Sequence, residues 1–132
     1  MEQDGAEKEN IISIYSRREA LEDGIQVDVS TTAKEAGIKF PVFLTRSVFE
    51  QYVAVPPGVF CQHEFSRLLN IVWTLKRAIG QGAANVARLS MELYFRNLNT
   101  GSTEFTTLVA ECGPLDFDDP RPAITIMLPD ED

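Results

Sequence analysis

The sequence predicts an α+β fold, with helices packed on one face of a mainly antiparallel sheet that ends in a C-terminal three-strand meander. Helical patterns dominate up to residue 80, whereas three segments with strand-like alternation follow one another from residue 89 onward. Short turn-rich segments join these strands. A length of 132 residues and a hydrophobic content of 44% fit one domain, which we assign to residues 11–132 after a flexible polar arm at residues 1–10.

The first helix is expected directly after residues 11–15, an apolar stretch that forms either a short strand or a buried lead-in. The segment SRREALEDG carries Ser16 and, three residues later, Glu19. This spacing is that of a capping box, in which each side chain accepts a hydrogen bond from the backbone of the other residue. Gly24 follows and is expected to end the helix.

A half-buried strand is expected next at residues 25–29, where apolar and polar residues alternate. The following segment repeats the helix pattern, with Thr32 and Glu35 as a second capping box and Gly37 as the end. Pro41 is expected to break the chain before the next element.

Two further helices are expected before residue 80. Residues 44–53 form one that is opened by Thr45, and the pair of prolines at 56–57 stops it. Residues 63–79 form the longest helix and the spine of the core. Its apolar face contains Phe65, Leu68, Leu69, Val72, Trp73, Leu75 and Ile79. Its polar side contains His63, Arg67, Asn70, Thr74 and Arg77.

Strands are expected at residues 89–96, 105–110 and 123–128. A turn joins the first two, and CGPLDFDDPRP is interpreted as a loop before the third because of its prolines and glycine. Pro129 ends the last strand, so the acids of the PDED tail are expected to extend into solvent.

The charge of the chain is strongly acidic and uneven. Of the net −8, residues 111–132 contribute −6 (seven acids, one base) and residues 1–110 contribute −2 (thirteen acids, eleven bases). A net-acidic chain repels the phosphate backbone, so no direct nucleic-acid binding is expected. No signal peptide or membrane-spanning stretch is visible, and Cys61 and Cys112 form no CxxC pair, which indicates a cytoplasmic protein with free thiols.

Catalytic and metal-binding patterns are weak. Cys61 and His63 could form a thiolate pair, but residues two apart on a helix do not face each other, and His63 is the only histidine. We expect Cys112 to be a buried small side chain. The acids of LDFDDP lack the pattern of an EF-hand loop, and no phosphate-binding glycine motif accompanies the bases at Arg67, Lys76 and Arg77. We therefore expect no cofactor, no metal and no enzyme activity.

The candidate binding residues are acids that could merge into one negative surface if the strand carrying Asp28 lies near the C-terminal strand. Scattered surface acids are the alternative. The candidates are Glu22, Asp23, Asp28, Asp116, Asp118, Asp119, Asp130, Glu131 and Asp132. Such a surface suits a basic partner.

Four segments carry a resemblance: EDGIQVDVSTTAKEAGIKFPVFLTRSVFEQY, VPPGVFCQHEFSRLL, LYFRN and ITIMLPDED. With them the chain, from about Ile14 to Asp132, resembles a family of small uncharacterised proteins found on bacterial plasmids, integrative elements and phages. The family favours an acid at the position of His63, which argues further against a catalytic histidine. The resemblance implies a setting in which small acidic proteins often bind restriction or CRISPR components of the host, some by mimicking the charge of DNA.

The leading hypothesis is thus a non-enzymatic inhibitor of a host nucleic-acid-targeting defence complex, acting through its acidic residues on a basic protein surface. One alternative is a homodimeric structural or regulatory accessory for plasmid or phage maintenance. A second alternative is a small enzyme that uses Cys61 or Cys112.

Overall fold

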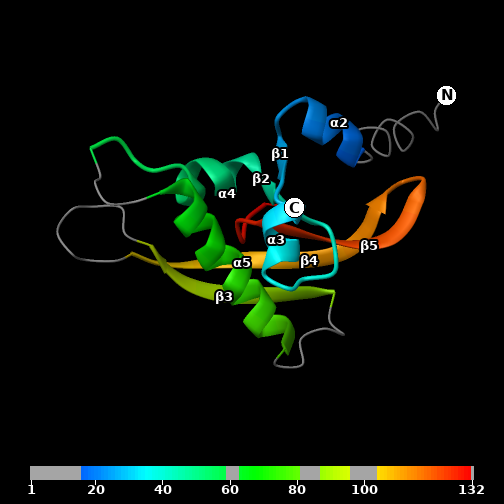
Figure 1. The fold of residues 1–132 in the computed structure, drawn as a ribbon. Helices are drawn as coiled ribbons and strands as arrows, with labels where there is room; N and C mark the ends of the chain where they lie inside the picture. Colours follow the sequence, from blue (N-terminus) through cyan, green and yellow to red (C-terminus); the bar gives the residue numbers. More distant parts are fainter. Residues whose placement is uncertain (1–15, 59–62, 81–86, 96–103, 132) are drawn as a thin grey trace.

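The structure is a computed structural model that describes residues 16–58, 63–80, 87–95 and 104–131. Its centre is a five-stranded sheet of order β1-β2-β5-β4-β3 with helices against it (Figure 1). The strands are β1 (Gln26–Asp28), β2 (Val42–Thr45), β3 (Arg88–Phe95), β4 (Glu104–Asp116) and β5 (Asp119–Met127). The helices are α2 (Arg17–Glu22), α3 (Ser30–Glu35), α4 (Arg46–Val48), the π-helix η1 (Phe49–Val53) and α5 (Glu64–Gly80).

The predicted α+β class is confirmed, but the sheet is mixed. β1–β2, β5–β4 and β4–β3 pair antiparallel, whereas β2 pairs parallel to β5. The expected arm at 1–10, the lead-in at 11–15 and the turn between β3 and β4 lie outside the described residues.

The two faces of the sheet are covered differently. Val42 and Leu44 of β2 belong to the main core, together with Ile124 and Ile126 of β5. The intervening Phe43 points to the opposite face, where the guanidinium of Arg17 from α2 lies 4.1 Å from its ring centroid. The expectation that all helices share one face is therefore wrong for α2, which packs on the face opposite the main core.

The first helix has the expected ends. Ser16 and Glu19 form both hydrogen bonds of a capping box, and Gly24 adopts a positive φ of 73° after the helix. The second expected capping box, at Thr32 and Glu35, is wrong. The N-cap of α3 is Val29, three residues before Thr32, and the helix begins at Ser30, whose backbone N–H donates to the carboxylate of Asp28 at 2.8 Å.

The segment after Pro41 contains a strand that the sequence analysis missed. Residues 42–45 form β2, and Thr45 then caps α4 by accepting from the Val48 N–H at 3.3 Å. The expected helix at 44–53 is therefore shorter, and its second part is the π-helix η1.

The long helix α5 is confirmed, but one residue of its expected polar side is buried. Arg67 is only 3% exposed and donates from Nε to the carbonyl of Tyr52 at 2.8 Å. Its guanidinium lies 5.4 Å from the ring centroid of Phe95. Conversely, Phe65 and Trp73 of the expected apolar face are exposed.

The expected loop at 112–122 is wrong. β4 continues to Asp116 and β5 begins at Asp119, so Phe117 and Asp118 form the turn of a long hairpin. The hairpin extends to one side beyond the helices α3, α4 and α5 (Figure 1). The alternation expected in β3 is confirmed, since Met91, Leu93 and Phe95 are buried between exposed neighbours.

Candidate functional site

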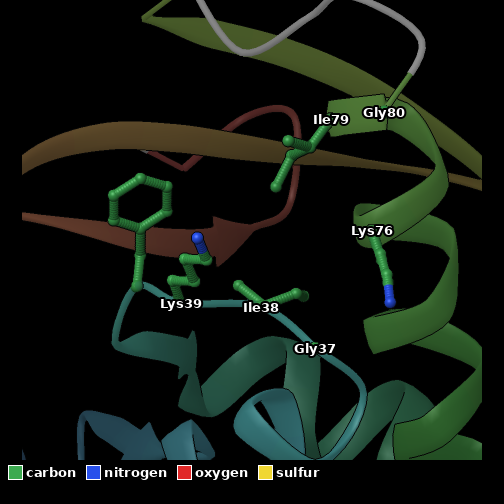
Figure 2. A pocket seen from close by; sticks show the side chains of 7 residues that line it. Gly37, Ile38, Lys39, Lys76, Ile79 and Gly80 are labelled. Carbon is green, nitrogen blue, oxygen red and sulfur yellow. The ribbon is translucent and has the colours of Figure 1, made fainter.

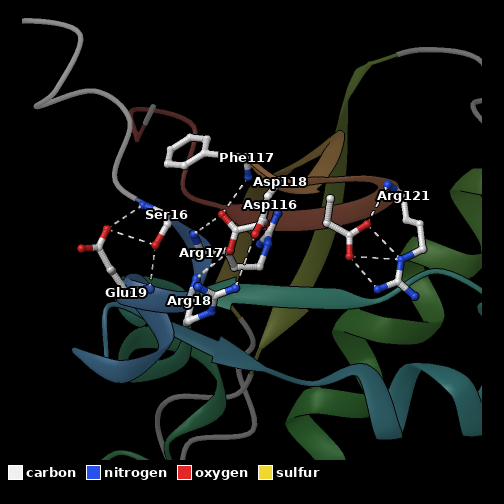
Figure 3. A network of polar contacts seen from close by, with 9 residues as sticks. Ser16, Arg17, Arg18, Glu19, Asp116, Phe117, Asp118 and Arg121 are labelled. Carbon is white, nitrogen blue, oxygen red and sulfur yellow. Dashed lines mark hydrogen bonds and ion pairs between the residues drawn. The ribbon is translucent and has the colours of Figure 1, made fainter.

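The tip of the β4–β5 hairpin presents an exposed aromatic ring between carboxylates. Asp116 and Asp119 are opposite each other across the two-residue turn, and Phe117 between them is 61% exposed. Figure 3 shows the polar contacts that connect this turn to the start of α2. The turn is therefore attached to the body of the protein by side chains as well as by its own strands.

Asp116 caps α2 from a strand far along the chain. Its carboxylate oxygens accept from the backbone N–H groups of Arg17 at 3.2 Å, Arg18 at 3.1 Å and Phe117 at 2.9 Å. Because Ser16 accepts from the Glu19 N–H at 3.0 Å, the first three N–H groups of α2 all have acceptors. Desolvation alone would raise the pKa of Asp116, but the backbone hydrogen bonds and the charge of Arg18 outweigh it and hold this pKa below its ordinary value.

The side chain of Arg17 connects the same helix to several strands. Its Nε donates to the Leu115 carbonyl at 2.6 Å, and its Nη1 donates to Gln26 Oε1 at 2.9 Å and Thr125 Oγ1 at 3.1 Å. Burial lowers the pKa of Arg17, although the carboxylates of Asp116 and Asp28 act in the opposite direction. This guanidinium thus holds α2, β1, β4 and β5 in one arrangement.

The remaining turn acids have cationic partners. Asp119 and Arg121 form a bidentate ion pair whose shortest contact is 2.6 Å. The side-chain hydrogen bond from Arg121 is the main cause that lowers the pKa of Asp119 to about 2. Asp118 lies 3.8 Å from Arg18, with its side chain 75% exposed. Asp118 is consequently the turn acid most available to a partner.

The structure brings together part of the predicted acidic surface. Asp28, Asp116, Asp118 and Asp119 line one shallow hollow, and the helix α2 contributes Arg17, Arg18 and Leu21 to it. The two basic side chains lie inside this hollow, so the surface is a mixture of charges instead of a purely negative patch.

The other predicted acids lie elsewhere. Glu22 and Asp23 are exposed at the end of α2, and Asp130 is exposed after β5. The expectation that the tail extends into solvent is wrong for Glu131, whose Oε1 accepts from Thr45 Oγ1 and from the Leu128 N–H, both at 2.8 Å. Asp132 lies outside the described residues.

The candidate pair of Cys61 and His63 is only half described: Cys61 lies outside the described residues, and His63 is exposed immediately before α5. Cys112 is a free thiol and is exposed on β4, so the expectation of a buried side chain is wrong. Within the described parts of the chain, no group of three or more potential metal ligands is present.

A lysine-lined groove on the other side of the molecule was missed by the sequence analysis. Figure 2 shows Lys39 and Lys76 around the apolar side chains of Ile38 and Ile79. Lys34 joins Lys39 in the adjoining hollow. Lys76 is 37 residues beyond Lys39, and the three lysines carry no motif, so only the packing of α3 against α5 could reveal the groove.

The fold and the site define an α+β protein with an acidic hairpin whose tip is attached to α2 by Arg17 and Asp116. A family model for proteins of unknown function, DUF6573, matches residues 3–132, and the chain belongs to this family. No curated protein and no solved structure is detectably similar to the chain. Among the described residues, no helix is long and apolar enough to cross a membrane.

Proposed function

We propose that the protein is a non-catalytic binding protein and that the tip of the β4–β5 hairpin contacts its partner. The observation that carries this proposal is the exposed ring of Phe117, which is held between carboxylates on the turn. Aromatic side chains supply a large share of the affinity at protein interfaces when they are buried in a partner's pocket. An exposed ring at a protruding turn is well placed for that role.

The attachment of the turn to α2 also supports a role in partner binding. Asp116 and Arg17 attach the turn to α2 through hydrogen bonds to backbone and side-chain groups. Binding by a turn that already has its bound shape loses little conformational entropy, so more of the contact energy appears as affinity.

The partner that we propose is a basic protein surface. The net charge of −8 and the exposed carboxylate of Asp118 would speed the encounter with such a surface and would oppose binding to nucleic acid. Proteins that bind nucleic acids expose basic surfaces. In the mobile-element setting that the sequence resemblance implies, we propose that the partner belongs to a host CRISPR or restriction complex and that binding inhibits it.

The test is protection of a targeted plasmid in a bacterial host with an active CRISPR or restriction system. Expression of the protein should raise the transformation efficiency of a plasmid that carries the target sequence. Phe117→Ser or Asp118→Lys should reduce this protection. Phe65→Ser is the matched control, because Phe65 is a similarly exposed ring on α5, away from the hairpin.

Two results would contradict the proposal. One is an absence of protection by the wild-type protein against any of a panel of such systems. The other is equal protection by wild-type protein and Phe117→Ser at equal expression. Where protection occurs, the affinity for the purified complex should fall as ionic strength rises, because exposed charges are screened.

A further inference from the structure

We propose that β3 is a homodimer interface, in which the β3 strands of two copies pair antiparallel and join their sheets into one. This surface is distinct from the hairpin tip, because β3 forms the far edge of the sheet in the order β1-β2-β5-β4-β3. The proposed dimer is therefore independent of the proposed function, and each can be tested without the other.

As an edge strand, β3 is long and regular, and it lacks three of the common protective features. The opposite edge strand, β1, has three residues, whereas β3 has eight. Protected edges commonly carry lysine, proline or a β-bulge. The sequence of β3 contains no lysine or proline, and its register with β4 runs from Arg88 to Phe95 without a shift.

The backbone groups along the outer edge of β3 are oriented for pairing. The Cys112 N–H donates to the Ala87 carbonyl at 2.8 Å, so residue 87 and every second residue after it direct their backbone groups towards β4. The backbone groups of Arg88, Ser90, Glu92 and Tyr94 consequently point outward. The Tyr94 carbonyl accepts from Asn70 Nδ2 at 2.9 Å, which agrees with this assignment. The N–H and C=O groups of Ser90 and Glu92, at the middle of the strand, are oriented to pair with another strand.

The strand β3 is also complementary to a second copy of itself. With a two-fold axis at Met91, Ser90 of one copy is opposite Glu92 of the other, and both residues have outward backbone groups, as a hydrogen-bonded pair requires. Arg88, which pairs with Glu111 of its own chain at 3.0 Å, is then opposite Tyr94 of the second copy and diagonal to Glu92 of the second copy. Opposite charges and an arginine beside an aromatic ring both stabilise cross-strand neighbours.

Two of the neighbouring registers are less favourable. A shift that places the axis at Glu92 sets the two Glu92 carboxylates directly opposite each other, and like charges in that position destabilise a sheet. A shift by one residue places core-facing side chains such as Met91 and Leu93 against solvent-facing ones. The two-fold register at Met91 avoids both problems.

Two exposed aromatic residues beside this edge also favour a second copy at β3, because pairing would shield them from solvent. Tyr94 and Phe105 are opposite each other on β3 and β4, are 61% and 53% exposed, and form an edge-to-face pair with ring centroids 5.2 Å apart. In the dimer, Arg88 of the second copy is the residue opposite Tyr94. The pair would therefore become partly buried at the end of the shared strand ladder.

The experiment is sedimentation velocity on the full chain over a concentration series, with matched proline variants. The wild type should sediment as a dimer at micromolar concentration. Ser90→Pro removes one outward N–H and should give a monomer with an unchanged circular dichroism spectrum, since this N–H does not bond to β4. Phe117→Ser, at the hairpin tip, should remain dimeric.

A second variant covers the case in which Ser90→Pro does not fold. Glu92→Arg places two like charges diagonally across the axis and should raise the dissociation constant at least about tenfold. A wild type that is monomeric up to about 100 µM, or a dimer that tolerates both Ser90→Pro and Glu92→Arg, would overturn the inference. A monomer that instead pairs β3 with a strand of another protein would overturn it as well.

Discussion

Replacing Asp116 with alanine should destabilise the protein, although this carboxylate lies at a surface turn. The carboxylate is the acceptor for the backbone N–H groups of Arg17, Arg18 and Phe117. Losing a helix N-cap costs about 0.5–2 kcal/mol, and a hydrogen bond to a charged acceptor contributes about 1.5–3 kcal/mol. Water can replace part of the lost contacts at this partly exposed site, so we expect a loss of about 2 kcal/mol in the free energy of unfolding.

The assay is urea denaturation followed by circular dichroism. For a denaturant slope of about 2 kcal/mol per molar, the midpoint of Asp116→Ala should fall by about 1 M. Asp116→Asn keeps one oxygen acceptor and should lose about half as much. Asp118→Asn is the matched control in the same turn, because its exposed ion pair with Arg18 at 3.8 Å contributes less than about 0.5 kcal/mol.

The pH dependence gives an independent check. The pKa of Asp116 is lower in the folded than in the unfolded protein, so its charged form stabilises the fold above the unfolded pKa of about 4. This stabilisation is lost as the pH falls through the lowered folded pKa. The difference between wild type and Asp116→Ala should therefore be constant from pH 5 to 8 and should narrow below about pH 4. Equal midpoints for wild type and Asp116→Ala at pH 7 would refute the assignment of Asp116 as the cap.

Three further substitutions test the contacts described above, each by urea denaturation. Arg17→Lys should lower the free energy of unfolding by about 2–3 kcal/mol, because a lysine cannot reach the Leu115, Gln26 and Thr125 acceptors together. A decrease below about 0.5 kcal/mol would contradict this. Gly37→Ala should cost about 1–2 kcal/mol because the backbone has a φ of 96°; unchanged stability would show that this conformation can relax. Arg67→Met should lower the free energy of unfolding by about 1–3 kcal/mol because the partly buried Tyr52 carbonyl loses this donor, and stability equal to wild type would refute that role.

The local elements of the fold could be predicted from the sequence where short-range chemistry determines them. The Ser16–Glu19 capping box, the long helix α5 and the alternation of β3 were all predictable, because each depends on residues a few positions apart. The parallel pairing of β2 with β5 was not, because no local pattern in VFLT specifies a distant partner.

The hairpin was missed because prolines usually interrupt strands. Pro114 and Pro122 are opposite each other, at a position where neither residue donates across the β4–β5 pair. Their nitrogens point away from the other strand of the hairpin, at levels beyond Arg88, the first residue of β3, and Val42, the first residue of β2. Among the described residues, therefore, no neighbouring strand needs a donor at these positions. Prolines therefore interrupt strands that have a neighbour on both sides, but they do not interrupt this projecting β4–β5 hairpin.

The candidate site was predictable in composition but not in arrangement. The sequence identifies Asp116, Asp118 and Asp119 as acids of one segment, but it treats them as equivalent. In the structure Asp116 caps a helix, Asp119 pairs with Arg121, and Asp118 remains largely exposed. The ring of Phe117 had no signal of its own, because a single apolar residue in an acidic segment gives no periodicity.

The cap of α2 has a consequence for how the chain folds during its synthesis. Arg17 and the carboxylate that receives its N–H are 99 residues apart, and β2 obtains its parallel partner only from β5, the last strand. The N-terminal third of the nascent chain therefore leaves the ribosome with its local Ser16–Glu19 capping box but without the Asp116 acceptor, and β2 lacks its parallel neighbour until translation is almost complete. A chain that terminates before residue 119 cannot complete the sheet, so we expect truncated products to be targets for chaperones and proteases.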